Sequence, residues 1–72
     1  MTSFILNEVI NDGEKIILMD GSIWQINPVD IPTVCTWIPT AEIDVSASDD
    51  TVFDHTLTNK NIGVSVMAMR LK

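Results

Sequence analysis

The sequence predicts an all-β fold: a small antiparallel barrel of five to seven short strands, closed or partly open, forming one domain over residues 1–72. Three observations predict it. An Asp-Gly turn separates two apolar stretches, strand-like stretches alternate with turns about every eight to twelve residues, and no helical periodicity is found. Closure removes the exposed edges of so small a sheet, so a barrel is the economical arrangement.

The clearest element is a hairpin over residues 14–26, which turns at Asp20-Gly21. Asp-Gly between apolar alternations is the strongest short-range hairpin signal. A two-residue loop would set Ile17 opposite Trp24 and Lys15 opposite Ile26, which places a charge in an apolar row. A slip of one residue sends every side chain to the other face, so the register matters.

A three-residue loop over residues 19–21, with Gly21 at the left-handed bulge position, gives a better pattern. It sets Ile16 opposite Trp24 and Leu18 opposite Ser22. The apolar row then contains no charge. We therefore predict this second closure.

Before and after this hairpin, turn and strand signals follow one another. Residues 4–10 are rich in strand formers and predict an opening strand, which a turn at Asn11-Asp12-Gly13 connects to the hairpin. The prolines of residues 27–32 lack the donor that a ladder needs, so a loop or single helical turn is expected there. Residues 33–38 are β-branched and aromatic and predict a strand that Pro39 ends.

The second half of the chain predicts three more strands. Residues 41–47 alternate between apolar and polar side chains, which is typical of a strand with one face in water. An acidic turn at 48–51 leads into a strand over 53–58, in which Phe53, His55 and Leu57 share a face. After another turn, residues 62–71 form the last strand, whose two faces are both apolar near its end.

Composition limits the classes of function. The net charge is −6, and the four basic residues (Lys15, Lys60, Arg70 and Lys72) do not cluster in the sequence, which disfavours nucleic-acid binding. No apolar run is long enough to predict membrane insertion. The chain is 46% hydrophobic and short, so some apolar side chains must stay exposed or meet a partner, either another protein or peptide or a second copy. The single cysteine, Cys35, excludes an internal disulfide.

The compartment depends on the status of Met1. If Met1 is the native start, a cytoplasmic protein is expected, because residues 1–10 lack the basic start and cleavage site of a signal peptide. If an export signal has been removed, a periplasmic or secreted protein is expected.

Five pieces of the sequence resemble a group of small bacterial β-barrel proteins. They are Asp20-Gly21-Ser22-Ile23-Trp24, Asp30, Trp37-Ile38-Pro39, Glu42 to Ala47 and Leu57-Thr58-Asn59. The resemblance covers roughly residues 13–71 and implies an SH3-like barrel. It implies no catalytic residues and no particular activity.

The two tryptophans are candidate binding residues. Trp24 and Trp37 could form an aromatic platform for a proline-rich peptide, a sugar or an unstacked base. Core packing is the favoured interpretation for Trp24, which shares a row with Ile16 and Ile26. Core or rim packing is also favoured for Trp37, beside Pro39.

Cys35 and His55 are the only thiol and the only imidazole, the two groups that a Cys-His hydrolase would need. A lone cysteine in a strand is usually an apolar filler, and so small a chain hardly provides a cleft. Asp44, Asp54 and the pair Asp49-Asp50 match no calcium or zinc spacing, and the pair is better explained as a solvated turn. No catalytic residue, metal or cofactor is therefore predicted.

Met67, Met69 and Leu71, with Met19 near them, form either an exposed adaptable patch or a surface covered by the N-terminal strand. We expect a non-enzymatic interaction or structural module that binds a protein or peptide. Its predicted contact residues are Trp37, Pro39, Met67, Met69 and Leu71. The alternative is an OB-like binder of single-stranded nucleic acid or a small ligand, which the charge balance opposes.

Overall fold

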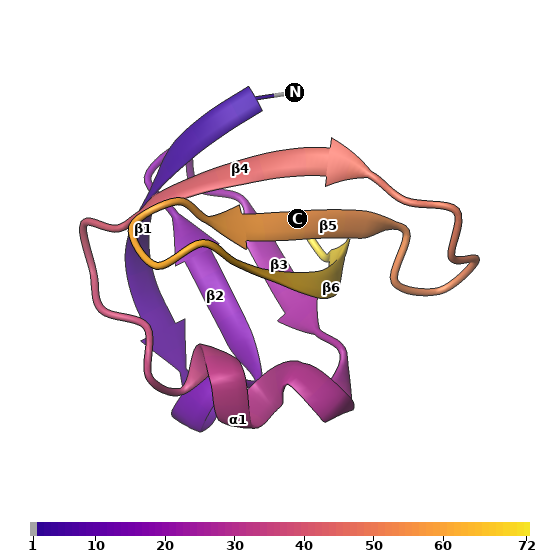
Figure 1. The fold of residues 1–72 in the computed structure, drawn as a ribbon, viewed down its shortest axis with the longest axis horizontal. Coiled ribbons are helices and arrows are strands. Elements are labelled where there is room, and N and C mark those ends of the chain that lie inside the picture. The colour runs from indigo at the N-terminus through magenta and orange to yellow at the C-terminus, as the bar shows by residue number, and fades with distance from the viewer. Residues whose placement is uncertain (1) are drawn as a thin grey trace.

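The computed structural model describes residues 2–72 and contains one closed antiparallel barrel, which confirms the predicted fold class (Figure 1). The six strands run in the order β1-β2-β3-β6-β5-β4. Two three-stranded meanders make up the barrel, and the pairings β1–β4 and β3–β6 join them. The strands are β1 Thr2–Ile10, β2 Lys15–Leu18, β3 Ile23–Ile26, β4 Glu42–Ala47, β5 His55–Asn59 and β6 Val64–Arg70.

The β2–β3 hairpin has the three-residue loop that the sequence predicts. Ile16 lies opposite Trp24, and the Leu18 N–H donates to the Ser22 carbonyl at 3.0 Å. Gly21 closes the loop at φ +90°, a conformation that glycine adopts without steric cost, and its N–H donates to the Leu18 carbonyl at 2.9 Å. The two-residue closure is wrong, and the apolar row faces the core.

Between the two meanders the chain is helical, so the strand predicted over residues 33–38 is wrong. A 3-10 turn, η2 (Pro28–Asp30), leads into α1 (Ile31–Val34). The Asn27 side chain accepts the N–H of Val29 at 3.3 Å, and proline in a first helical turn needs no donor. The helical turn predicted around residues 27–32 is thus confirmed and continues further.

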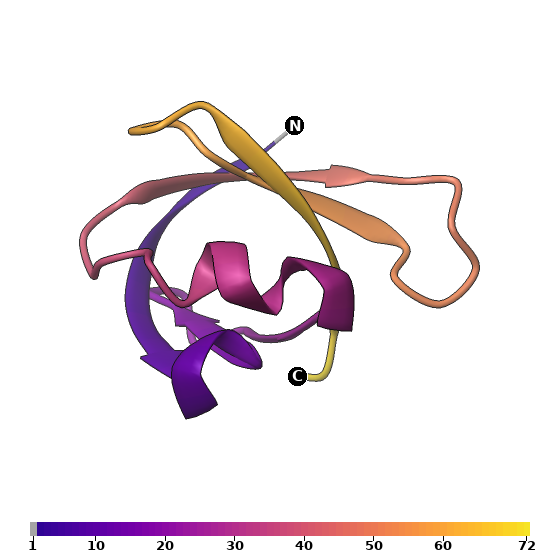
Figure 2. The same ribbon diagram turned by 60° about the horizontal axis from the view of Figure 1, so that its bottom comes forward.

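This helical segment closes one end of the barrel (Figure 2). Val34 and Trp37 are 0% and 4% exposed and fill that end. Strand propensity describes how well a side chain fits a pleated, half-buried surface. The burial of these two side chains on a helical backbone outweighs that preference. The helix α1 contacts η1 (Asn11–Gly13), which is the turn predicted between β1 and β2.

The core consists of inward side chains from all six strands, from α1 and from the segment between α1 and β4: Leu6, Ile16, Leu18, Trp24, Ile26, Val34, Trp37, Ala41, Ile43, Leu57, Val66 and Ala68. The alternations predicted for β4 and β6 are present. The strand predicted over 53–58 begins later, at His55, because the Asp50 carboxylate accepts the N–H groups of Val52 and Phe53 at 2.8 and 2.9 Å and holds them in a bend.

Candidate interaction surface

The outer face of β2, β3 and β6 carries an apolar patch, called here the apolar face and formed by Ile17, Ile23, Met67, Met69 and Leu71. The first four alternate with the buried residues of the same strands, so they point outward, and Leu71 directly follows β6. Ile17 lies opposite Ile23, and the Leu71 N–H donates to the Ile23 carbonyl at 2.8 Å. Side chains opposite one another on one sheet face are in contact range, so the patch is continuous.

This face is partly open to solvent, and at one end the Ser48 and Thr56 hydroxyls lie 3.9 and 3.6 Å from the Met67 sulfur. Leu71 is 46% exposed and the other four side chains are half-buried. Met19, at the tip of the hairpin, is 58% exposed and extends the same outward row toward Ile5 on β1, which is 39% exposed. β1 pairs with β2 and β4 and does not cover β6, so the methionines are not buried under the N-terminal strand. An exposed contiguous apolar patch is typical of a surface that meets a partner.

The other two predicted contact residues, Trp37 and Pro39, do not lie on the apolar face. Trp37 is 4% exposed and belongs to the core, so its ring is not available as a platform. Pro39 is exposed together with Ile38, in a loop that bonds to β1 through the Thr40 N–H and the Leu6 carbonyl at 2.8 Å. The loop therefore lies beside β1 and before β4, outside the apolar face.

Trp24 is also a core residue, at 2% exposure, which confirms the favoured interpretation. Its indole Nε1 donates to Ser22 Oγ at 2.9 Å, and that hydroxyl donates to Asp20 Oδ1 at 2.6 Å. The His55 ring meets the indole edge-on at 5.0 Å between centroids, and the Arg70 guanidinium lies 5.9 Å from the ring centroid. The hairpin tip is thus fastened to the end of the barrel opposite α1.

The Asp20 carboxylate is stabilised in its charged form. Its pKa lies below the ordinary 3.8 because the Ser22 hydroxyl and then the Ser22 N–H donate to it, and the positive charge of Arg70 acts in the same direction. Because the folded pKa is depressed, the contribution of this carboxylate to stability is fully present above the ordinary pKa of an unfolded aspartate. The contribution is lost as the pH falls through the folded value.

We expect Ser22→Ala to raise the pKa of Asp20 toward its ordinary value, because the largest stabilising hydrogen bond is removed. Titration of the side-chain carboxyl carbons by NMR measures this shift. Ser65→Ala, which removes an exposed hydroxyl on β6, serves as the control and should leave the Asp20 titration in place. An unchanged Asp20 pKa in Ser22→Ala would contradict the assignment.

The structure does not bring Cys35 and His55 together. Cys35 follows α1 at the closed end, is exposed, and donates its thiol to the Pro32 carbonyl at 2.9 Å. His55 begins β5 at the opposite end, and its Nδ1 lies 2.8 Å from Asp54 Oδ1. A nucleophile and its base must lie within hydrogen-bond reach, so this pair does not form a Cys-His site.

The predicted acidic turn is present in the loop between β4 and β5. Asp50 bonds the loop backbone, as an aspartate in a turn commonly does, and Asp49 is exposed beside it. Across residues 2–72, no three His, Cys, Asp or Glu side chains are grouped to hold a metal ion. In the same residues, no helix has the length and apolarity to cross a membrane.

Comparison of the chain with protein-family models, with curated proteins and with solved structures gave no match. The site therefore rests on the geometry alone. Sequence reasoning found Met67, Met69 and Leu71 but did not assign Ile17 and Ile23 to the same face. The register of the predicted hairpin contained that signal, since it turns both isoleucines to the side opposite Trp24.

Proposed function

We propose that this chain is a non-enzymatic interaction or structural module that binds protein or peptide partners through the apolar face. The observation that carries the proposal is the continuous outward row of Ile17, Ile23 and Leu71 with Met69 beside it. Methionine side chains are flexible and polarisable, so they adapt to the shape of a partner. A small barrel with a filled core offers its outer surface rather than its interior for binding.

We also propose that the barrel is SH3-like and related to the small bacterial barrels with an Asp-Gly-Ser-x-Trp hairpin. The roles of the shared residues support this relation. Asp20, Ser22 and Trp24 form one hydrogen-bonded relay, and Gly21 provides the left-handed loop position. Asp30 Oδ2 accepts the Met67 N–H at 3.0 Å, at the point where β3 leaves β6.

The proposed binding is tested by selecting a displayed random-peptide library on the immobilised protein. We expect enriched peptides whose binding falls about tenfold or more in Leu71→Asp, because a charge replaces an apolar contact. Ile38→Asp is the matched control, since Ile38 is 67% exposed and lies in the loop before β4, outside the apolar face. Both variants should keep the circular dichroism spectrum of the parent protein.

Self-association through the same face would also support the proposal, and light scattering across a wide concentration range detects it. The proposal is overturned if no peptide is enriched and the protein remains a monomer at every concentration. It is equally overturned if Leu71→Asp and Ile38→Asp bind the selected peptides as the parent does.

A further inference from the structure

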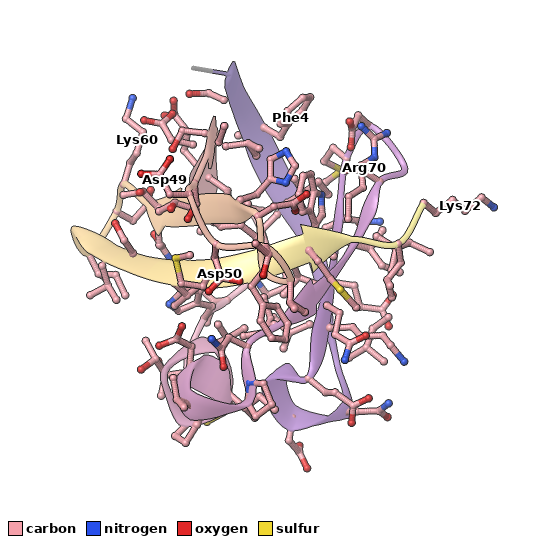
Figure 3. The ribbon with its side chains drawn as sticks, turned by 90° about the vertical axis from the view of Figure 1, so that its right-hand side faces the viewer. Phe4, Asp49, Asp50, Lys60, Arg70 and Lys72 are labelled. Atoms are coloured by element: carbon pink, nitrogen blue, oxygen red, sulfur yellow. The ribbon has the colours of Figure 1, made fainter. Side chains whose placement is uncertain are left out.

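Two hydroxyl groups converge on the sulfur of Met67, at one end of the apolar face. The Thr56 hydroxyl donates to Met67 Sδ at 3.6 Å, and the Ser48 hydroxyl donates to the same atom at 3.9 Å. Thr56 lies opposite Met67 in the β5–β6 ladder, whereas Ser48 follows β4 at the start of the loop that leads to β5. That loop faces the viewer in Figure 3, where Asp49 and Asp50 mark its position. A thioether is only a weak acceptor, so two donors are more than this sulfur needs.

Both donors are held in place by other contacts. The Ser48 N–H donates to the Asp54 carbonyl at 2.9 Å and closes the base of the loop. The Asp50 N–H donates to Ser48 Oγ at 3.3 Å, which leaves the hydroxyl proton free to point at the sulfur. Thr56 is fixed by the ladder itself. A stronger acceptor at the position of the sulfur would therefore find two donors already oriented.

The backbone of Met67 is fixed by the segment that follows β3. Its N–H donates to Asp30 Oδ2 at 3.0 Å, and its carbonyl accepts the Asn27 N–H at 2.9 Å. The side chain is half-buried, which leaves its sulfur within reach of a molecule as small as a peroxide. Met69 is half-buried on the same face but lies opposite Gln25, and none of the hydroxyl hydrogen bonds within residues 2–72 is made to its sulfur. The two methionines thus differ in their hydroxyl neighbours rather than in their exposure class.

We propose that Met67 is a regulatory oxidation site, at which a peroxide converts the thioether to a sulfoxide and the Thr56 and Ser48 hydroxyls donate to the new oxygen. With hydrogen peroxide, the sulfur attacks one oxygen, the O–O bond breaks, and the proton on the transferred oxygen passes to the departing hydroxide. The sulfur loses two electrons, and the peroxide is reduced to water. A sulfoxide oxygen is a much better acceptor than a thioether, so both hydroxyls gain an ordinary hydrogen bond.

This inference rests on the proposed function and names how the apolar face is regulated. Oxidation replaces a flexible apolar side chain by a polar, chiral one, which disfavours an apolar partner. At Met67 the hydroxyls satisfy the new oxygen, so the barrel is expected to stay folded. Methionine sulfoxide can be reduced enzymatically, which makes the loss of binding reversible.

The site is tested in the full chain with Cys35→Ser, Met19→Leu and Met69→Leu, which keeps Met67 as the one thioether of the apolar face. Leucine conserves the volume of methionine, and serine keeps a donor at position 35. NMR of methyl-labelled methionine follows sulfoxide formation in hydrogen peroxide, and Met67→Leu assigns the signal. Urea unfolding then compares oxidised with unoxidised protein. Oxidation of Met67 should change the unfolding equilibrium constant by no more than about twofold, because the new oxygen is hydrogen-bonded.

Thr56→Val and Thr58→Val, each made in that protein, form the matched pair. Oxidation of Thr56→Val should raise the unfolding equilibrium constant about tenfold, because the sulfoxide oxygen has lost a donor. The Thr58 hydroxyl pairs with Ser65 Oγ at 2.8 Å rather than with Met67, so Thr58→Val should respond to oxidation as its parent does. Ser48→Ala should act in the same direction as Thr56→Val. Each variant is compared with its own unoxidised form, so the effect of the substitution alone cancels.

Binding of the peptides selected on the immobilised protein gives the second readout. Oxidation should weaken binding about tenfold or more in the protein that keeps Met67, because a polar group enters the apolar contact. The same treatment of Met67→Leu should leave binding unchanged, since no thioether then remains on the apolar face.

The inference is overturned if Met67 forms no sulfoxide under conditions that fully oxidise free methionine, or if oxidation destabilises Thr56→Val and Thr58→Val equally. Peptide binding that survives oxidation of Met67 overturns it as well. In each case the proposed function still stands when peptides bind the unoxidised protein and lose binding in Leu71→Asp. If no partner binds the unoxidised apolar face, the proposed function and its regulation fall together.

Discussion

Gly13→Ala is expected to lower the free energy of unfolding by about 3 kcal/mol or more. Gly13 is buried where η1 meets the end of α1, and its φ is +110°. A Cβ at this position would lie 2.7 Å from the Cys35 nitrogen and 2.7 Å from the Ile31 carbonyl oxygen. Both are backbone atoms, so neither can rotate away. The helix α1 would therefore have to move away from η1.

Gly63→Ala is the matched control. Gly63 also has a positive φ, +70°, but a Cβ there meets nothing within 4 Å. Gly63→Ala should lower the free energy of unfolding only by the backbone strain of a left-handed alanine, about 1–2 kcal/mol. Urea unfolding followed by circular dichroism gives both values. Equal losses at the two positions would show that α1 does not press on Gly13.

Trp37→Ala is expected to cost about 3–5 kcal/mol, which is typical for removal of a buried large aromatic side chain. Trp37 is 4% exposed and fills the closed end of the barrel beside Val34. A domain of this size is only marginally stable, so the variant should be largely unfolded in the absence of stabilising solutes. Loss of the near-ultraviolet circular dichroism signal and a shifted urea midpoint measure the effect.

Two further variants explain the origin of that cost. Ile38→Ala, at a side chain 67% exposed, should change stability by no more than about 0.5 kcal/mol. Trp37→Phe should cost less than Trp37→Ala, since it keeps most of the ring and removes the buried Nε1, which has no hydrogen-bond partner among the described residues. If Trp37→Ala were as stable as Ile38→Ala, the packing of Trp37 at the closed end would not stabilise the barrel.

Local chemistry determined the β2–β3 hairpin from the sequence alone. The Asp20-Gly21 turn, the left-handed glycine and the two-residue period of a strand are properties of neighbouring residues, so they specified the closure and the pairing of Ile16 with Trp24. The outward direction of Met67 and Met69 followed from the same period, whereas their degree of exposure did not. The barrel class followed from the number and spacing of such elements.

Only the tertiary structure decided the segment between the meanders. Residues 33–38 have strand propensity, but the end of the barrel had to be closed by Val34 and Trp37, and the burial of those side chains favours a helical path. The tertiary structure also decided the apolar face. Ile23 and Leu71 are 48 residues apart in the sequence, and they meet only because β3 pairs with β6. Contacts between distant residues depend on the closed barrel, whereas the hairpin depends on its own turn.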